Sequence, residues 1–574
     1  MFLKLCYIWV EDYRNFQEMG FNFSSDVKFS YDNSNKTLKT VNIEPLPENF
    51  FGQRITDVTG LIGKNGSGKS NVLELICKLL KGGKAALTKP FLIVTYETSG
   101  YVCLKSNLTV SDSSGIPVEE YDGNIDPLKI IYFSNVFDER VHNFDRAVSD
   151  ISNNYRYPRN RYPYSLNRTT SDFEKQIKFI DSPAFNTLNI EHPKKIRLTS
   201  NYFNKRKYFR KVSPYGNDEY ISNQIDQFLS SFQKRTSDLK SSNKFFFYVV
   251  VYTFFVETLR FLNISKSKEE DKDSVLYKLN ELFENLGFSE NNLKRTDIIV
   301  NSLIEWMIYT LDKELSYIKG KRLENELVEL LKNIRILKSL EEYIISINIE
   351  VITEGTRSRK STSFVIDSIR LKKGDNKSFF ELFQNSRMFS IDWVGISSGH
   401  KAYLNIFSLL NFELKKVRKE NTLICIDEGD LYLHPKWQIE FFDKLVNNLP
   451  EIYKGNIQLI LTSHSPFLLS DLPKQNVTII ENETPESSTI NGTDLNKQTF
   501  AGNIYNLYAE PFFLNDERTS IFAKKKIKNL ASRLNKEKED LTNTEIYDME
   551  REIKFIGDDI IRNHLWNRLE TIKK

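Results

Sequence analysis

The residues best suited to bind a phosphate form a short glycine-rich segment. Residues 63–70 read GKNGSGKS and fit the pattern G-x-x-x-x-G-K-[ST] in full. Its glycines would let backbone N–H groups turn inward around phosphate oxygens, Lys69 would reach the β- and γ-phosphates, and Ser70 would ligate Mg²⁺. Apolar Leu61 and Ile62 precede the loop and a helical pattern over Asn71–Leu80 follows it, a context that a chance match would lack. The candidate phosphate-binding residues are Gly63, Lys64, Asn65, Gly66, Ser67, Gly68, Lys69, Ser70 and Asn71.

A second candidate is a pair of acids at the end of an apolar run. Leu423–Ile426 is typical of a central parallel strand, and Asp427 and Glu428 follow it directly. Beside a phosphate site, the first acid would hold Mg²⁺ and the second could act as general base toward the attacking water. The alternative is a strand that ends in a solvated acidic turn.

Two further polar segments each adjoin a regular element. Ser398 and Gly399 open a helical pattern 28 residues before Asp427. They fit either a second helix N-terminus aimed at phosphate or an ordinary helix cap. His464 follows another apolar strand, 37 residues beyond Asp427, where it could contact a γ-phosphate or the attacking water, or serve a structural role.

The order of these four elements resembles the ABC-type ATPase heads of the SMC and RecF class. Lys69 and Ser70 match Walker A, Ser398 and Gly399 the signature motif, Asp427 and Glu428 Walker B, and His464 the switch histidine. The resemblance implies ATP and Mg²⁺ as cofactors and a head-to-head dimer, in which each ATP lies between one P-loop and the partner's signature serine. Two positions depart from the pattern: His400 stands where the heads carry an acidic or Gln-like residue, and Asn135 stands in place of a Gln.

The resemblance narrows to the PtuA ATPases of Septu antiphage systems and of some retrons. It rests on Val10–Ser24, on Ile130–Glu139 and above all on Gln498–Ile527, which reads QTFAGNIYNLYAEPFFLND followed by FAKKKI. It implies a homodimer or higher homo-oligomer and a separately encoded HNH nuclease, PtuB. In retron versions a reverse transcriptase and its RNA–DNA product join the assembly.

Composition limits the other classes of function. The chain has 574 residues with 80 Lys+Arg against 76 Asp+Glu, a net charge of +4, so it lacks the overall charge of a protein that coats nucleic acid. Its four cysteines have no paired spacing, which argues against disulfides and zinc. The most apolar run, Phe245–Val256, is twelve residues long, whereas a membrane span needs about twenty. We therefore expect a buried helix or strand there, no membrane association and a cytoplasmic protein.

These elements predict an α/β protein: a P-loop ABC-type ATPase head with a mainly parallel sheet, split by a mostly helical insert and followed by a helical C-terminal tail. The expected boundaries are 1–148 for lobe one, 149–385 for the insert, 386–485 for lobe two and 486–574 for the tail. Within the insert, short strands are expected at Ile345–Ile352 and Ser363–Leu371.

The insert also holds a basic, aromatic-rich stretch. Cations neutralise phosphates and rings stack on unpaired bases, so this stretch is a candidate contact with nucleic acid or an acidic partner. A solvated loop with core aromatics is the alternative. The candidate residues are Arg156, Arg159, Arg161, Lys205, Arg206 and Lys207.

Three functions remain in competition. The first is the ATPase subunit of an antiphage complex, which binds and slowly hydrolyses ATP to hold or release a nuclease. The second is a RecF- or SMC-like DNA-repair ATPase, which long coiled-coil arms would favour; the helical insert is instead punctuated by Gly287 and Gly320. The third is an OLD-like nuclease, against which the lack of a clustered acidic nuclease pattern argues.

Overall fold

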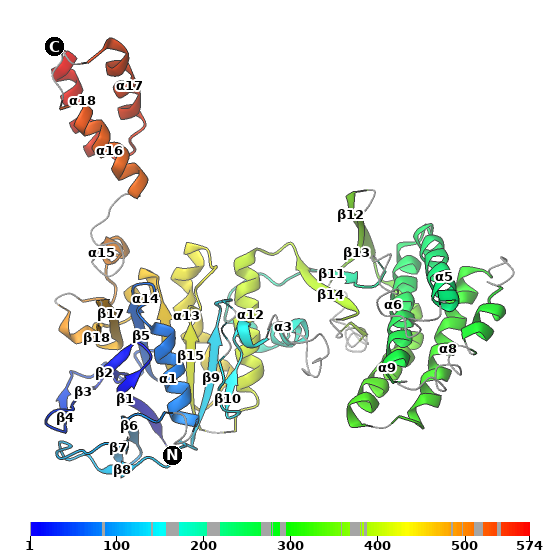
Figure 1. Ribbon diagram of the computed structural model, residues 1–574, viewed down its shortest axis with the longest axis horizontal. Coiled ribbons are helices and arrows are strands. Elements are labelled where there is room, and N and C mark those ends of the chain that lie inside the picture. Colours follow the sequence, from blue (N-terminus) through cyan, green and yellow to red (C-terminus); the bar gives the residue numbers. More distant parts are fainter. Residues whose placement is uncertain are drawn as a thin grey trace. The chain divides into compact units, whose positions relative to one another are not determined.

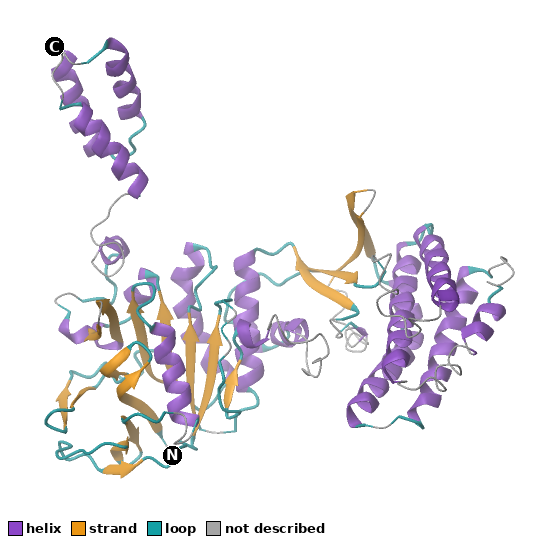
Figure 2. Ribbon diagram, viewed as in Figure 1, coloured by secondary structure: helices purple, strands orange, loops and turns teal. Residues whose placement is uncertain are grey.

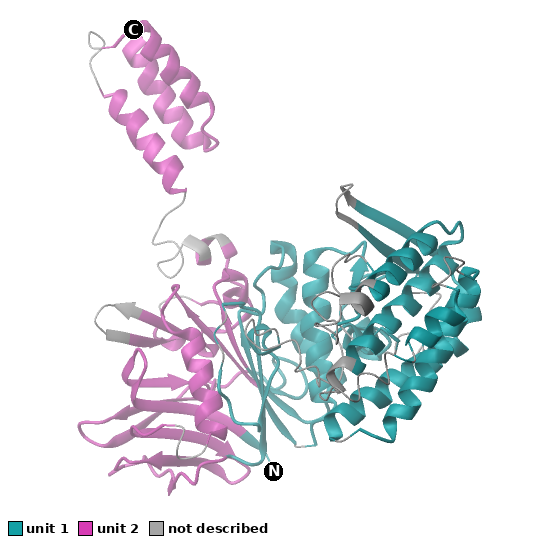
Figure 3. Cartoon of the chain, turned by 45° about the vertical axis from the view of Figure 1, so that its right-hand side comes forward, with its two compact units in different colours: residues 1–3, 47–56, 125–459 teal, residues 4–46, 57–124, 460–574 magenta. Residues whose placement is uncertain are grey.

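The computed structural model describes residues 2–82, 87–138, 140, 142–156, 172–203, 219–265, 277, 279–287, 294–318, 320–356, 359–367, 379, 382–383, 387–418, 420–483, 486–495, 498–509, 520–535, 541–573. The chain divides into two compact units, each built from segments that are far apart in sequence (Figure 3). Unit 1 comprises residues 1–3, 47–56 and 125–459, and unit 2 comprises residues 4–46, 57–124 and 460–574.

The largest sheet has seven strands in the order β10-β9-β15-β16-β5-β17-β18. Strand β15 is buried at every position, as its apolar sequence predicts. The pairs β9–β10, β9–β15 and β5–β17 are parallel, and β17–β18 is antiparallel. The predicted α/β fold with a mainly parallel sheet is therefore confirmed. The strands are β10 (Val148–Asp150), β9 (Leu128–Ser134), β15 (Asn421–Asp427), β16 (Asn456–Ser463), β5 (Ile55–Gly63), β17 (Val477–Glu483) and β18 (Glu486–Asn491).

Unit 2 also contains a second sheet, whose five strands have the order β2-β1-β6-β7-β8. A hairpin of β3 and β4 covers a core that includes Trp9, Phe29 and Leu38. The elements are β1 (Leu3–Tyr13), β2 (Phe16–Asn22), β3 (Val27–Asp32), β4 (Thr37–Asn42), β6 (Phe91–Glu97), β7 (Gly100–Ser106), β8 (Val118–Glu120) and the helix α1 (Lys69–Lys81).

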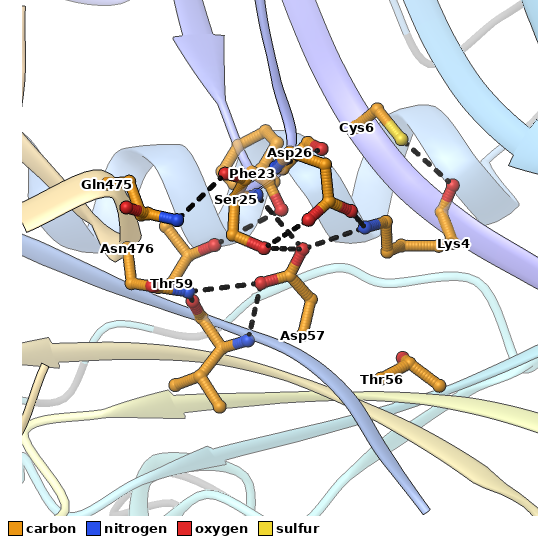
Figure 4. Close-up of polar contacts among 12 residues, drawn as sticks. Lys4, Cys6, Phe23, Ser25, Asp26, Thr56, Asp57, Thr59, Gln475 and Asn476 are labelled. Carbon is orange, nitrogen blue, oxygen red and sulfur yellow. Dashed lines mark hydrogen bonds and ion pairs between the residues drawn. The ribbon is translucent and has the colours of Figure 1, made fainter. Parts of the chain in front are cut away.

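A buried ion pair ties these strands together (Figure 4). The ammonium of Lys4 on β1 lies 2.9 Å from Asp57 on β5 and 2.9 Å from Asp26. Asp57 also accepts hydrogen bonds from the backbone N–H of Ser25 and from the side chain of Asn476. Burial alone would lower the pKa of Lys4, but the carboxylates of Asp57 and Asp26 outweigh it and raise that pKa. Burial also raises the pKa of Asp57, an effect that the ammonium of Lys4 opposes.

Beyond its strands, unit 2 contains several helices. It contains α14 (Pro466–Asp471), the short helices η4 (Lys474–Asn476) and η5 (Gly492–Asp494), α15 (Ile504–Ala509), α16 (Ile521–Arg533), α17 (Asn543–Lys554) and α18 (Asp559–Lys573). The last three helices share a hydrophobic core of their own that includes Leu530, Ile553 and Leu569 (Figure 1).

Unit 1 contains a helical group and a separate antiparallel sheet in the order β12-β13-β11-β14. Its elements are α2 (Asn153–Arg156), α3 (Asp172–Ile180), α4 (Pro183–Asn186), β11 (Lys195–Ser200), α5 (Glu219–Ser237), α6 (Ser242–Ser265), α8 (Thr296–Leu315), α9 (Lys321–Ser339), α10 (Glu341–Ser346), β12 (Ile349–Thr356), β13 (Arg359–Asp367), β14 (Phe389–Val394), α12 (Ser398–Leu414) and α13 (Pro435–Ile452).

The apolar run at Phe245–Val256 lies in α6, which packs against α5, α8 and α9 (Figure 2). Among the described residues this is the one helix long and apolar enough to cross a membrane, and its most apolar stretch is entirely buried within the protein. Burial against neighbouring helices is the behaviour of a core helix, as the sequence predicts.

The sequence-based prediction of a strand at Ile345–Ile352 is wrong in its starting residue. Residues up to Ser346 continue the helix α10, and the strand β12 begins at Ile349. The isoleucine-rich sequence fits the hydrophobic periodicity of a helix as well as that of a strand, and Ile344 is buried on the helix. The next strand, β13, spans Arg359–Asp367, so it starts four residues before the expected Ser363.

Candidate nucleotide-binding site

The glycine-rich loop joins β5 to α1 in unit 2, as its sequence predicts. Gly66 and Gly68 have φ of 81° and 102°, in the left-handed region where a side chain is strained. Gly63 is closely packed, since an added Cβ would lie 2.3 Å from the carbonyl oxygen of Ile480. By contrast, an added Cβ at Gly66 would meet nothing within 4 Å. The loop therefore combines a fixed base with an open tip.

Lys69 begins helix α1 and is buried within this loop. Its Nζ donates to the carbonyl oxygens of Gly63 at 2.9 Å and of Lys64 at 3.1 Å. The same Nζ lies 3.4 Å from Nδ1 of His464. Because an ammonium has only donors, Nδ1 accepts in that contact and the ring proton of a neutral His464 sits on Nε2.

His464 follows β16 and is half-buried. It precedes α14, where the side chain of Ser465 caps the helix by accepting from the backbone N–H of Phe467. The structure thus brings together two of the residues singled out in the sequence, which lie 395 positions apart.

A turn that the sequence reasoning missed supports the loop. Asn15, between β1 and β2, donates from Nδ2 to the carbonyl oxygen of Ser67 at 3.1 Å and accepts from Asn71 at 2.6 Å. Its neighbour Arg14 has a φ of 56° and donates to Asn71 at 2.9 Å and to Glu74 at 2.7 Å. The sequence did offer one signal for the turn itself, because Asn is a residue that tolerates tight hairpin turns.

Asp427 and Glu428 lie at the end of β15, in unit 1. Asp427 is buried, and its Oδ2 accepts from Ser134 Oγ at 3.2 Å. Glu428 is half-buried with a φ of 48°, unusual for a residue with a side chain. A positive φ at the end of a buried strand turns the chain sharply after the two acids.

Asn135, the residue that stands in place of a Gln, follows β9 beside this turn. Its side-chain nitrogen donates to the carbonyl oxygen of Leu431 at 2.8 Å, and its backbone N–H donates to that of Asp427 at 3.2 Å. Asn135 therefore ties the loop after Asp427 to the neighbouring strand.

The serine-glycine segment forms the start of α12, also in unit 1. Ser397 is the cap, and its side chain accepts from the backbone N–H of His400 at 3.2 Å. Ser398 is exposed, while Gly399 is buried against Trp437, to which an added Cβ would approach within 3.3 Å. The cap is thus Ser397, one residue before the segment considered in the sequence, and Ser398 is exposed at the helix start.

His400 is buried beside Trp437, and its Nε2 has no hydrogen-bond partner among the residues that the structure describes. Burial lowers the pKa of His400 from its ordinary value of 6.5, and the carboxylate of Glu191 offsets part of that effect. The neutral imidazole is thus favoured in this position.

Of the six basic candidate residues, Arg156 is described. Its side chain is 9% exposed, and its guanidinium forms an ion pair with Asp172 and donates to Asn405 at 3.3 Å. These contacts are internal to unit 1 and leave little of the cation for an outside phosphate. Arg159, Arg161, Lys205, Arg206 and Lys207 lie outside the described residues.

In the described part of the chain, no group of three or more His, Cys, Asp or Glu side chains is close enough together to hold a metal ion. The magnesium ligands expected from the sequence, Ser70 and Asp427, are one hydroxyl and one carboxylate. A set of one or two protein oxygens suits Mg²⁺ at a phosphate site, because phosphate oxygens and waters supply its remaining ligands.

Comparison with known proteins gives partial matches. Residues 271–470 match the family described as "AAA domain, putative AbiEii toxin, Type IV TA system". This range contains Ser398, Asp427 and His464 but not the glycine-rich loop.

Named relatives match over limited stretches. The chain is 28% identical over 197 residues to the retron Vc95 probable ATPase of Vibrio cholerae serotype O1 biovar El Tor, which covers 33% of this chain and 35% of that protein. It is 29% identical over 109 residues to the retron Ec83 probable ATPase of Escherichia coli, covering 18% and 19% of the two chains. It is 39% identical over 66 residues to the Septu protein PtuA of Bacillus mycoides (strain KBAB4), covering 11% and 9%. The match thus spans about a third of the length of the first of these proteins. By these matches the chain is related to the retron probable ATPases and to the Septu protein PtuA.

Proposed function

We propose that the protein is the ATP-binding and ATP-hydrolysing subunit of an antiphage defence complex. The observation that carries the proposal is the arrangement of Lys69, whose ammonium is held across the glycine-rich loop beside His464. A lysine cation and a glycine-rich loop at a helix N-terminus suit a nucleotide phosphate. The names of the relatives support the defence assignment.

In this proposal each site residue has a defined role. Lys69 exchanges its carbonyl contacts for the β- and γ-phosphates, and Ser70 and Asp427 hold Mg²⁺. When bound, Mg²⁺ neutralises charge on the phosphate oxygens. Glu428 accepts a proton from the attacking water, and His464 hydrogen-bonds the γ-phosphate or that water.

The signature segment acts from a second copy of the chain. Ser398 is exposed at the N-terminus of α12, where a hydroxyl and the helix dipole would both favour an anion. We propose that Ser398 and Gly399 approach the nucleotide of a partner head, so that ATP holds a homodimer or larger homo-oligomer together.

The further partners are part of the same proposal, and the similarity to retron and Septu proteins supports them. Since this chain is similar to a Septu PtuA and to retron ATPases, we propose that a separate HNH nuclease supplies the cleavage activity, with a reverse transcriptase and its RNA–DNA product in a retron setting. We place this assembly in the cytoplasm.

Glu428→Gln in the full chain tests the hydrolytic role. The amide cannot take the proton, so kcat for ATP should fall at least about 100-fold. ATP binding should be retained, and the ATP-bound dimer should accumulate in light-scattering measurements. Glu440→Gln, on helix α13, is the matched control and should hydrolyse ATP like the wild type. Turnover unchanged in Glu428→Gln would remove Glu428 from the base role.

A further inference from the structure

The three C-terminal helices α16, α17 and α18 form a bundle with its own core. Leu530 and Leu534 of α16 pack with Met549 and Ile553 of α17 and with residues of α18. Thr542 starts α17 with a capping box, in which its side chain and that of Glu545 satisfy each other's backbone N–H groups. The bundle therefore presents its remaining helix faces on a fixed scaffold.

Helix α16 carries only positively charged side chains among its ionisable residues. Its sequence, IFAKKKIKNLASR, holds five basic residues and no acid. Lys525 and Lys528 are exposed, lie three residues apart and so share one face, opposite the buried Leu530 and Leu534. Like charges at this spacing repel one another, which destabilises an isolated helix.

The position of the lysines near the start of α16 destabilises the helix further. A helix N-terminus carries a partial positive charge, so cations are favourable in the last turn and unfavourable in the first. Lys524, Lys525 and Lys526 fall in the first two turns of α16. Such an arrangement gains stability when an anion binds.

An exposed aromatic ring lies among the lysines. Phe522 is 73% exposed, and the ammonium of Lys526 lies 5.8 Å from its ring centroid. The adjacent Ile521 is 67% exposed. Cations beside an accessible ring are the combination that binds unpaired nucleic acid, because phosphates pair with the cations and a base stacks on the ring.

We propose that α16 is a binding surface for single-stranded nucleic acid, with Lys525 and Lys528 on the phosphates and Phe522 stacked on a base. The surface is separate from the nucleotide site and requires neither ATP binding nor hydrolysis. Its partner is defined by its chemistry: a flexible chain of phosphates whose bases are unpaired.

The test is fluorescence anisotropy of the full-length protein with a labelled oligothymidylate of about 20 nucleotides, without ATP, over about 50 to 200 mM salt. Lys525→Gln combined with Lys528→Gln should weaken binding at least about tenfold at the lowest salt and reduce the slope of log K against log salt by about 1.4. Phe522→Ala should weaken oligothymidylate binding about fivefold while leaving the salt slope unchanged.

The matched control removes the same charge elsewhere in the bundle. Arg551 on α17 and Arg568 on α18 are exposed, so Arg551→Gln combined with Arg568→Gln should leave affinity within about twofold of the wild type. Unchanged affinity in the lysine variant, or an equal loss in the control, would overturn the proposal. So would a polyglutamate peptide that competes as well as the oligonucleotide, since the surface would then select acidic protein.

Discussion

At the scale of single residues, the chemistry of the site depends on how each charged group is surrounded. Lys69 is buried, yet its ammonium has two carbonyl oxygens and a histidine nitrogen within reach. These neutral acceptors hold the cation in place without cancelling its charge. A phosphate that displaced them would gain a charge-assisted contact.

His400 illustrates the opposite case, a buried titratable group whose Nε2 finds no hydrogen-bond partner in the described part of the chain. Its pKa is lower in the folded chain than its ordinary 6.5, so the unfolded state binds the proton more readily. The stabilisation is fully present above about pH 6.5 and is lost as the pH falls from there toward the lowered folded pKa.

Replacing His400 with Gln should therefore flatten the acid side of the stability profile. We expect the drop in Tm between about pH 7.5 and 5.5 to be smaller in His400→Gln than in the wild type. Differential scanning fluorimetry of the full chain measures both profiles, with the exposed His564→Gln as control. Parallel profiles for the wild type and His400→Gln would show that His400 does not carry this pH dependence.

Residue types and spacing were enough to predict that the glycine-rich loop, the two acids and His464 each lie at the end of a strand, because each motif is contiguous and adjoins a strongly apolar run. They were not enough to predict Asn15, whose contacts with Ser67 and Asn71 span 52 and 56 positions. The sequence of a hairpin turn does not indicate which distant residues the turn will contact. Likewise, Arg156 sits in a basic stretch by sequence but forms an internal ion pair with Asp172.

At the scale of elements, the turn between β1 and β2 fixes the loop between β5 and α1. An added Cβ at Gly68 would lie 2.6 Å from Nδ2 of Asn15 and 2.8 Å from the ring of Phe16. The turn thus lies directly against the start of α1, and glycine at position 68 permits the approach. Helix α1 is positioned by this contact as well as by its own apolar face.

Asn15→Ala removes the two hydrogen bonds that Asn15 makes, one to Ser67 of the loop and one to Asn71 of α1. Since each is worth about 0.5–1.5 kcal/mol, we expect ATP to bind about three- to tenfold more weakly. Isothermal titration calorimetry with a non-hydrolysable ATP analogue gives the comparison. Asn33→Ala in the β3–β4 hairpin is the control and should bind like the wild type. An affinity in Asn15→Ala equal to that of this control would show that the turn does not position the loop.

The boundaries of elements were less predictable than their existence. Helix α10 runs to Ser346 because Ile344 is buried on its helical face, although the following isoleucines also suit a strand. The boundary between helix and strand depends on which residues are buried by tertiary packing, and the local sequence pattern does not contain that information.

At the scale of the whole molecule, each unit is assembled from distant segments, so contacts between those segments hold it together. In unit 2, Lys4 joins β1 to Asp57 on β5, and Asn476 reaches Asp57 from the region after α14. The sequence predicts an insert between two lobes, but not which buried charges connect segments of one unit. The lobe boundaries at residues 148 and 385 remain predictions.

Lys4→Met should destabilise unit 2 by about 3–5 kcal/mol, because it leaves Asp57 buried without its cation. Combining it with Asp57→Asn removes the unpaired charge and should recover part of the loss. Tm of the full chain measures both variants, with the exposed Lys36→Met as control. A Tm for Lys4→Met equal to that of the control would contradict a structural role for the buried pair.

The central claim is that the glycine-rich loop binds the phosphates of ATP, and Lys69→Ala tests it most directly. The measurement is the Kd of the full-length protein for a fluorescent ATP analogue with Mg²⁺, with Lys36→Ala, an exposed residue of the β3–β4 hairpin, as the matched control. We expect Lys69→Ala to abolish binding, since the ammonium of Lys69 is the cation held against the loop carbonyls, whereas Lys36→Ala should bind normally. Binding by Lys69→Ala within about threefold of the wild type would contradict the claim, because loss of a charge-assisted contact should cost at least about tenfold.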